Sequence, residues 1–210
     1  MNFIKPDIED YAFAHTRPEP ELLTELAEFT REEMELPQML TGRLEGRFLK
    51  MLVAISGARR ILEIGMFTGY SALSMAEAMP SDGRIITCDI DPRAEKVAKS
   101  FFARSPFGER ISIAMGPALE TIAGLEGSLD LVFLDADKEN YPQYYEAVFP
   151  KVRSGGLIVV DNCLWSGSVL APKAESDEAI ARLNSRVAGD SRVENVILTV
   201  RDGINLIRKI

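Results

Sequence analysis

The chain has 210 residues, of which 46% are hydrophobic and 27% charged, and its formal net charge at pH 7 is −8. This length suits one domain with a substantial buried core, and no apolar run reaches the roughly 20 residues that a membrane helix needs. The excess of acidic residues disfavours broad binding to nucleic acids or anionic lipids and favours a small-molecule ligand.

The cellular compartment of the protein can be predicted from its first residues and from its cysteines. The opening segment, MNFIKPDIEDYAFA, carries charges where a signal peptide has its apolar stretch. Cys88 and Cys163 belong to neither a CxxC pair nor a metal-ligand spacing, so both are predicted to be reduced structural thiols. We therefore expect a cytoplasmic protein without a membrane segment.

The first fifty or so residues have a helical pattern. Segments 18–34 and 44–57 place apolar residues at helical spacing. The pattern then changes to short apolar runs. We predict one domain, 1–210, in which residues 1–57 form a helical cap and residues 58–210 form the core.

In the core, apolar runs alternate with helical stretches. The predicted strands are 59–65, 84–90, 111–115, 129–136, 156–162, 193–200 and 203–210, and the predicted helices are 71–79, 92–105, 118–124, 141–149 and 175–187. Strands that are apolar on both faces and linked by helices indicate a parallel sheet covered on two sides.

The last two strands are joined by Arg201-Asp202-Gly203, which is a hairpin turn signal. Their pairing is therefore expected to be antiparallel. The whole pattern predicts an α/β fold, namely a Rossmann-like, doubly wound, seven-stranded and mostly parallel sheet with an antiparallel edge strand and N-terminal helices. Ligands of such a sheet bind at the carboxyl ends of its strands.

The first predicted strand leads into a glycine-containing turn, EIGMFTGYS, at residues 63–71. Gly65 and Gly69 permit a tight turn and close approach of a ligand. Their spacing is not the G-x-G-x-x-G of dinucleotide-binding proteins. A carboxylate at Glu63 would repel a pyrophosphate and attract the amino group of an amino-acid ligand.

The second predicted strand ends at Asp89, where a carboxylate can accept hydrogen bonds from both ribose hydroxyls. Asp91 is better placed to cap the next helix, with Pro92 at its first position. Taken singly, Glu63 and Asp89 could also be solvated strand-end residues. Together they flank the glycine turn on consecutive strands, which favours a binding site.

Oxygen-bearing side chains follow two further strands. Asp135 ends one apolar run, and Asp161 and Asn162 end the next. Neighbouring parallel strands place their carboxyl ends side by side, so these side chains can converge on one hard cation such as Mg²⁺. The set contains no His or Cys, which argues against zinc. The alternative for each aspartate is a cap or turn after a strand.

These motifs resemble the metal-dependent, small-molecule O-methyltransferases, which are the caffeoyl-CoA O-methyltransferase group and, more distantly, catechol O-methyltransferase. The similarity extends from about Tyr11 to Ile210 and is strongest in LEIGMFTGYSAL, DLVFLDADKENY, GGLIVVDNCLWSGSV and DGINLIRK. The resemblance implies S-adenosylmethionine (SAM) as the methyl donor, a divalent metal and a homodimer.

The resemblance also assigns residues to the donor and the metal. It implies that Glu63 and Gly65 contact the methionine part of SAM, that Ser71 supports its carboxylate, that Asp89 binds the ribose, that Thr41 covers the donor and that Ala118 lies near the adenine. Phe67, Asp135 and Asp137 complete the predicted donor site, and Asp135, Asp161 and Asn162 are the implied metal ligands.

Lys138 resembles the catalytic lysine of the family. Two adjacent hydroxyls on the acceptor could chelate the metal, which would lower the pKa of those hydroxyls. Lys138 would take the departing proton, because the nearby cation and partial burial favour a neutral amine. The phenolate would then attack the methyl group in line. A plain surface lysine is the alternative.

Trp165 and Tyr144 are predicted to line the acceptor site, although Trp165 could equally cover the edge of the sheet. Ser166 stands where the family often has asparagine, and the segment after Val169 is shorter, so caffeoyl-CoA itself is not inferred. We expect a small phenolic acceptor, namely a vicinal dihydroxy aromatic. The alternatives are methylation of a hydroxylated tRNA base and SAM binding without turnover; an NAD-dependent dehydrogenase does not fit the glycine spacing.

Overall fold

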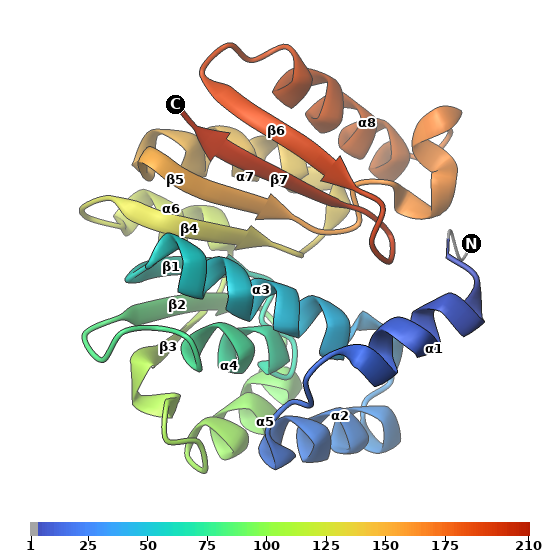
Figure 1. The fold of residues 1–210 in the computed structure, drawn as a ribbon. Coiled ribbons are helices and arrows are strands. Elements are labelled where there is room, and N and C mark those ends of the chain that lie inside the picture. The colour runs from blue at the N-terminus through green and yellow to red at the C-terminus, as the bar shows by residue number, and fades with distance from the viewer. Residues whose placement is uncertain (1–3) are drawn as a thin grey trace.

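The structure is a computed structural model, and it describes residues 4–210. Within these residues the strands form one seven-stranded sheet in the order β3-β2-β1-β4-β5-β7-β6 (Figure 1). The strands are β1 (Arg60–Ile64), β2 (Arg84–Asp89), β3 (Ile111–Met115), β4 (Leu129–Leu134), β5 (Val152–Val160), β6 (Val193–Leu198) and β7 (Ile204–Lys209). The strand order changes direction between β1 and β4, which is where doubly wound sheets bind ligands.

The pairing of the strands confirms the predicted fold class. The five strands β3, β2, β1, β4 and β5 are parallel to one another. β7 runs antiparallel to both β5 and β6, so the predicted hairpin is present. Its second strand is inserted next to β5, and β6 becomes the edge of the sheet.

Helices cover both faces of the sheet. One face carries α2 (Glu21–Glu33), α3 (Arg43–Ser56), α4 (Tyr70–Ala76) and α5 (Pro92–Phe102), and the other carries α6 (Ala118–Gly124), α7 (Tyr141–Val148) and α8 (Glu175–Ala188). α1 (Pro6–His15) lies at the end of the sheet to which β4 and β5 point (Figure 1). Short 3₁₀ segments occur at Pro37–Met39, Gly108–Arg110, Lys138–Asn140, Phe149–Lys151 and Trp165–Leu170.

The two faces have separate apolar cores because successive strand residues point to opposite sides. Ile61 and Phe133 pack with the helices of the first face, whereas Leu62 and Val132 pack with those of the second. All four side chains are at most 1% exposed. Burial of each such side chain contributes about 1.5–3 kcal/mol, so the central strands are strongly held.

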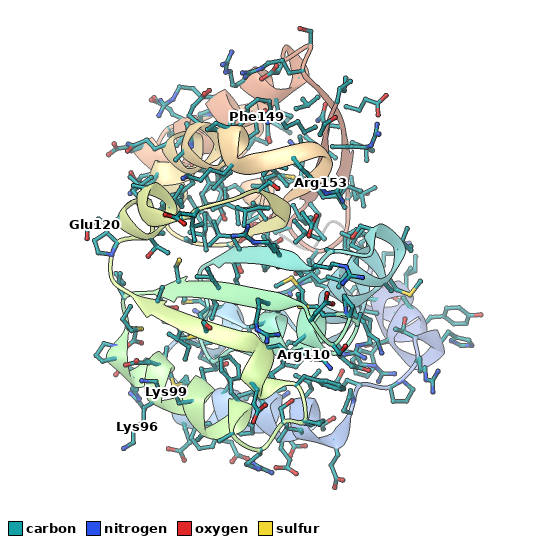
Figure 2. All side chains as sticks on the ribbon, turned by 90° about the vertical axis from the view of Figure 1, so that its left-hand side faces the viewer. Lys96, Lys99, Arg110, Glu120, Phe149 and Arg153 are labelled. Atoms are coloured by element: carbon teal, nitrogen blue, oxygen red, sulfur yellow. The ribbon has the colours of Figure 1, made fainter. Side chains whose placement is uncertain are left out.

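α5 shows how the sequence specifies these helices. The side chain of Asp91 accepts a hydrogen bond from the backbone N–H of Arg93 at 2.8 Å, so the predicted cap is confirmed. Phe101 is buried in the apolar core of the first face. Lys96 and Lys99 are exposed and point away from the molecule (Figure 2). One apolar face and one charged face are what an amphipathic surface helix requires.

The structure also bears on the predictions for the cysteines, for the N-terminal helices and for a membrane segment. Cys88 and Cys163 are free, buried thiols, and burial raises the pKa of both. The predicted helix 18–34 begins only at Glu21, after Pro20 at its N-cap. Between residues 4 and 210, no helix is both long and apolar enough to span a membrane. Residues 1–3 of the predicted cap lie outside the described residues.

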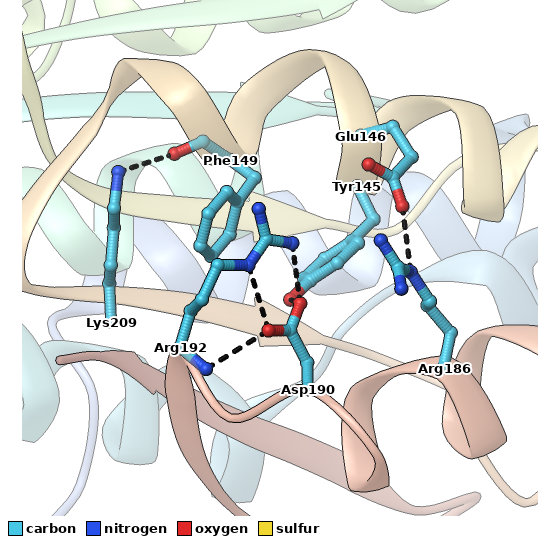
Figure 3. A network of polar contacts seen from close by, with 7 residues as sticks. All are labelled: Tyr145, Glu146, Phe149, Arg186, Asp190, Arg192 and Lys209. Atoms are coloured by element: carbon cyan, nitrogen blue, oxygen red, sulfur yellow. Dashed lines mark hydrogen bonds and ion pairs between the residues drawn. The ribbon is translucent and has the colours of Figure 1, made fainter.

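A polar network ties β7 and the segment before β6 to the 3₁₀ segment Phe149–Lys151, which follows α7 and precedes β5 (Figure 3). Arg192 donates to Asp190 through Nε at 2.8 Å and Nη2 at 2.6 Å, and its guanidinium lies 4.0 Å from the Phe149 ring centroid. Lys209 Nζ donates to the Phe149 carbonyl at 2.9 Å. The bonded Arg192 guanidinium holds the pKa of Asp190 well below its usual range.

Candidate active site

A cavity of about 1240 Å³ lies at the carboxyl ends of the parallel strands. It is larger than the roughly 300–1,000 Å³ of a typical small-molecule site, which leaves room for a donor and an acceptor together. The predicted site residues that line it are Thr41, Gly65, Phe67, Ser71, Asp89, Ala118, Asp135, Asp137, Lys138, Tyr144, Asp161, Asn162 and Trp165. The structure therefore brings together every predicted site residue except Glu63.

The turn after β1 depends on its two glycines. Gly65 has a φ of +99°, and a Cβ at this position would lie 1.8 Å from the carbonyl oxygen of Asp135. Gly69 has a φ of +86°, and its Cβ would lie 2.5 Å from the Phe102 ring. Both positions need glycine for their backbone angle and for close packing. The G-x-x-x-G spacing thus fixes the β1 turn directly against β4 and α5.

Asp89 connects the end of β2 to this turn. Its carboxylate accepts hydrogen bonds from the backbone N–H groups of Phe67 and Ile90 at 2.7 Å and of Asp91 at 2.8 Å. A carboxylate has about four acceptor positions, so one is left for a ligand on the cavity side. This geometry suits the predicted contact with a ribose.

Glu63 lies behind the wall of the cavity. Its side chain is 0% exposed, and it accepts a hydrogen bond from the Thr87 hydroxyl. Burial raises the pKa of Glu63 to about 8, although the nearby Ser71 and Thr87 hydroxyls oppose this rise. The other oxygen, Oε1, has no hydrogen-bond partner among the described residues. A contact between Glu63 and the donor stays a prediction.

The acceptor side of the cavity contains Asp135, Lys138 and Asp161. Lys138 Nζ donates to Asp135 Oδ1 at 2.9 Å and to the Tyr141 hydroxyl at 2.5 Å, and it lies 5.7 Å from the Trp165 ring centroid. Lys138 is 9% exposed and Tyr141 is fully buried. The ammonium group is therefore held at the cavity wall between a carboxylate and two aromatic rings.

Asp161 carries the clearest electrostatic signature of this site. Burial and the charge of Asp135 together raise its pKa to about 7, against the opposing effects of Arg201 and Lys138. Two carboxylates that face one cavity and repel each other favour a bound cation. Asn162 follows with a φ of +56°, so the chain changes direction directly after β5.

The charge of the cavity also favours cationic ligands. Seven acidic and two basic residues line it. Such a surface attracts a positively charged molecule and a metal ion. Within residues 4–210 no cluster of three or more His, Cys, Asp or Glu side chains could hold a metal. The predicted metal ligands include only two carboxylates, so metal binding would also need the Asn162 amide and oxygen atoms from outside the chain.

The sequence did not reveal one part of the site. Arg201, in the turn between β6 and β7, donates from Nη1 to Oε2 of Glu45 on α3 at 3.0 Å. Burial raises the pKa of Glu45 well above its usual value, as does the charge of Asp161, while Arg201 lowers it. The sequence pattern indicates only a turn at Arg201, and nothing near Glu45 distinguishes it from other helix residues.

A doubly wound sheet with an acidic, glycine-flanked cavity at its switch point is the architecture of an α/β ligand-binding domain. The chain belongs to the O-methyltransferase family, whose model matches residues 13–210. It is 39% identical to caffeoyl-CoA O-methyltransferase 2 of Zea mays, over 91% of this chain and 78% of that protein. It is 38% identical to caffeoyl-CoA O-methyltransferase 1 of Nicotiana tabacum, over 91% and 86%.

Solved structures give the same assignment. The O-methyltransferase TomG of tomaymycin synthesis from Streptomyces achromogenes, in complex with SAM, has a TM-score of 0.89 and 28% identity, over 97% of this chain and 96% of that one. An O-methyltransferase from Bacillus cereus, in complex with S-adenosylhomocysteine (SAH), has a TM-score of 0.89 and 28% identity, over 97% of each chain. The class predicted from the sequence, a SAM-dependent O-methyltransferase, is confirmed.

Proposed function

We propose that this protein transfers the methyl group of SAM to one hydroxyl of a small vicinal dihydroxy aromatic, with a divalent metal and Lys138 as the base. One observation carries the proposal. Asp135, Asp161 and Lys138 line the same cavity as Asp89 and the glycine turn. Relatives that are named for caffeoyl-CoA support a phenolic acceptor.

The donor half of the cavity binds and orients SAM, which supplies an electrophilic methyl group on a sulfonium. Asp89 is oriented by three backbone N–H groups and presents its remaining acceptor position to the ribose hydroxyls. Thr41 is 6% exposed and Ser71 is 3% exposed, so both can contact the donor where little water competes. The surplus of acidic residues attracts the cationic donor.

A divalent metal fits the residues at the acceptor half. Asp135, Asp161 and Asn162 would hold it, and their hard oxygen atoms suit Mg²⁺. Burial, and after it the charge of Asp135, raise the pKa of Asp161, so a cation between the two carboxylates would offset both effects. When bound, the metal would orient both acceptor hydroxyls and stabilise the negative charge of the deprotonated one.

Lys138 is placed to move the proton. Its Nζ is fixed by Asp135 and Tyr141 at the wall of the cavity, and its side chain is mostly withdrawn from solvent. In its neutral form it would accept the proton of the acceptor hydroxyl. Trp165, whose ring centroid lies 5.7 Å from Lys138 Nζ, would then confine the aromatic ring, so that the oxygen lies in line with the methyl group. The Tyr144 hydroxyl donates to Asp137 Oδ1 at 2.6 Å, next to the donor residues, so a contact of Tyr144 with the acceptor stays a prediction.

The test is a screen of dihydroxy aromatics and their monohydroxy analogues with methyl-labelled SAM, with and without a strong chelator. Turnover is expected only for the dihydroxy compounds and only without chelator. Asp161→Ala is expected to lose at least about 100-fold of kcat/KM, because a metal ligand is removed, while SAH affinity in calorimetry stays within about threefold. Turnover that persists in the presence of the chelator would refute the proposed role of the metal.

Three broader expectations also stay proposals. We propose that residues 1–57 cap a core of residues 58–210 in one domain, that the protein is a homodimer and that it acts in the cytoplasm. Light scattering during gel filtration tests the dimer directly. A mass of 23.2 kDa, which is that of one chain, would contradict it.

A further inference from the structure

Arg201 contacts the N-terminal side of the cavity from a distant part of the sequence. The backbone of Arg201 has a φ of +50° in the turn between β6 and β7. The guanidinium donates from Nη1 to Glu45 Oε2 at 3.0 Å and from Nη2 to the carbonyl of Leu40 at 3.2 Å. Leu40 and Thr41 both line the cavity. One side chain therefore holds both α3 and the segment that precedes it.

The same turn contacts the acceptor side through its backbone and through Asp202. The N–H groups of Cys163 and Leu164 donate to the carbonyls of Gly203 and Asp202 at 3.0 and 2.9 Å. The N–H of Ser166 donates to Asp202 Oδ1 at 2.6 Å. These contacts fix the segment that directly follows the proposed metal ligands and includes Trp165.

The contact between Arg201 and Glu45 is a buried ion pair. The Glu45 side chain is fully buried, and that of Arg201 is 30% exposed. Among residues 4–210, Oε1 of Glu45 has no hydrogen-bond partner, so Arg201 is the group that balances this carboxylate. Loss of one member of a buried pair leaves the other charge uncompensated, whereas removal of both charges is better tolerated.

We infer that Arg201 is a positioning residue that couples the donor half of the cavity to the acceptor half. It holds the carbonyl of Leu40, the neighbour of Thr41, on one side, and its turn holds the segment after Asn162 on the other. The acceptor part of this inference rests on the proposed function. The donor part does not, because SAH affinity can be measured without an acceptor or a metal.

The principal test is the double variant Glu45→Gln/Arg201→Met, in which neither charge remains buried alone. The matched control is Glu194→Gln/Arg208→Met, because that pair lies on the same hairpin at the same 3.0 Å but is exposed and does not line the cavity. Thermal unfolding establishes that both variants fold. Calorimetry with SAH and steady-state kinetics with SAM and a dihydroxy aromatic then measure the two halves of the site.

We expect the first variant to bind SAH about tenfold more weakly and to raise the KM of both substrates, while the control matches the parent protein. Arg201→Lys should recover part of the SAH affinity, since it keeps a cation on the same turn. An unfolding midpoint that falls while SAH affinity and both KM values stay unchanged would show a purely structural role and overturn the inference. If no phenol is methylated even by the parent protein, the proposed function fails, and SAH affinity still decides the donor part.

Discussion

Replacement of Gly65 by alanine tests whether the β1 turn must contact β4 as closely as the structure shows. The added Cβ would lie 1.8 Å from the carbonyl oxygen and 2.6 Å from the carbonyl carbon of Asp135. Both are backbone atoms in a paired strand end, because the N–H of Asp135 donates to the carbonyl of Ile64 at 2.9 Å. No side chain can rotate to relieve this overlap.

The size of the effect follows from the geometry. Since real Cβ contacts are not below 3.0 Å, the two backbones must separate by about 1.2 Å. Overpacking costs about 1–3 kcal/mol, and a left-handed backbone at a residue with a Cβ costs about 1–2 kcal/mol more. Movement of a binding group by about 1 Å can also cost about 100-fold in rate. We therefore expect Gly65→Ala to lose roughly 2–5 kcal/mol of stability and about 100-fold in kcat/KM.

The assay is urea unfolding followed by circular dichroism, together with SAH calorimetry and kinetics on the folded protein. Gly57→Ala is the control, because Gly57 has a φ of +63° but nothing within 4 Å of the added Cβ. It should lose only about 1–2 kcal/mol and keep its activity. If Gly65→Ala unfolds at the same urea concentration as Gly57→Ala and binds SAH with the same affinity, the close contact with Asp135 is not required. That result would refute the reasoning.

Two further substitutions test other parts of the structure. Trp165→Leu should raise the KM of the acceptor about tenfold and leave that of SAM unchanged, because an aromatic wall is lost from the acceptor side; a rise confined to the KM of SAM would contradict this. Asp190→Asn should lower the free energy of unfolding at neutral pH. The Asp190 pKa is depressed in the folded protein, so its carboxylate stabilises the fold above about pH 4 and this contribution is lost as the pH falls through the folded pKa. Urea midpoints should therefore differ most from those of the parent at about pH 7, and the difference should be smaller at about pH 3, where the pH has begun to approach the depressed folded pKa. An equal difference at both pH values would refute the ionic explanation.

The parallel core could be predicted because each of its elements is specified locally. The apolar runs that end at Ile64, Asp89 and Leu134 are strands apolar on both faces, and α5, which follows the second of them, has a clear amphipathic pattern. The glycine turn and the acids after the strands were predicted for the same reason, since a strand end places its next side chain at the sheet edge. Parallel topology then brought them into one cavity.

The contacts that lock this cavity could not be predicted in the same way. Glu45 and Arg201 are separated by 156 positions, and neither lies in a local pattern that indicates its partner. The contact of Lys138 with Tyr141 depends on the path of a short 3₁₀ segment, which periodicity does not reveal. The place of β7 between β5 and β6 likewise depends on packing across the whole sheet.

The three backbone hydrogen bonds to Asp89 have a consequence for the thermodynamics of donor binding. They fix the carboxylate and the turn at Phe67 in the free protein, so little conformational entropy remains to be lost there when a ribose arrives. Binding on this side should therefore resemble the fitting of a ligand to a preformed surface. Substitutions that loosen Asp89 should appear mainly as a less favourable entropy of binding, even where the direct contact with the ligand survives.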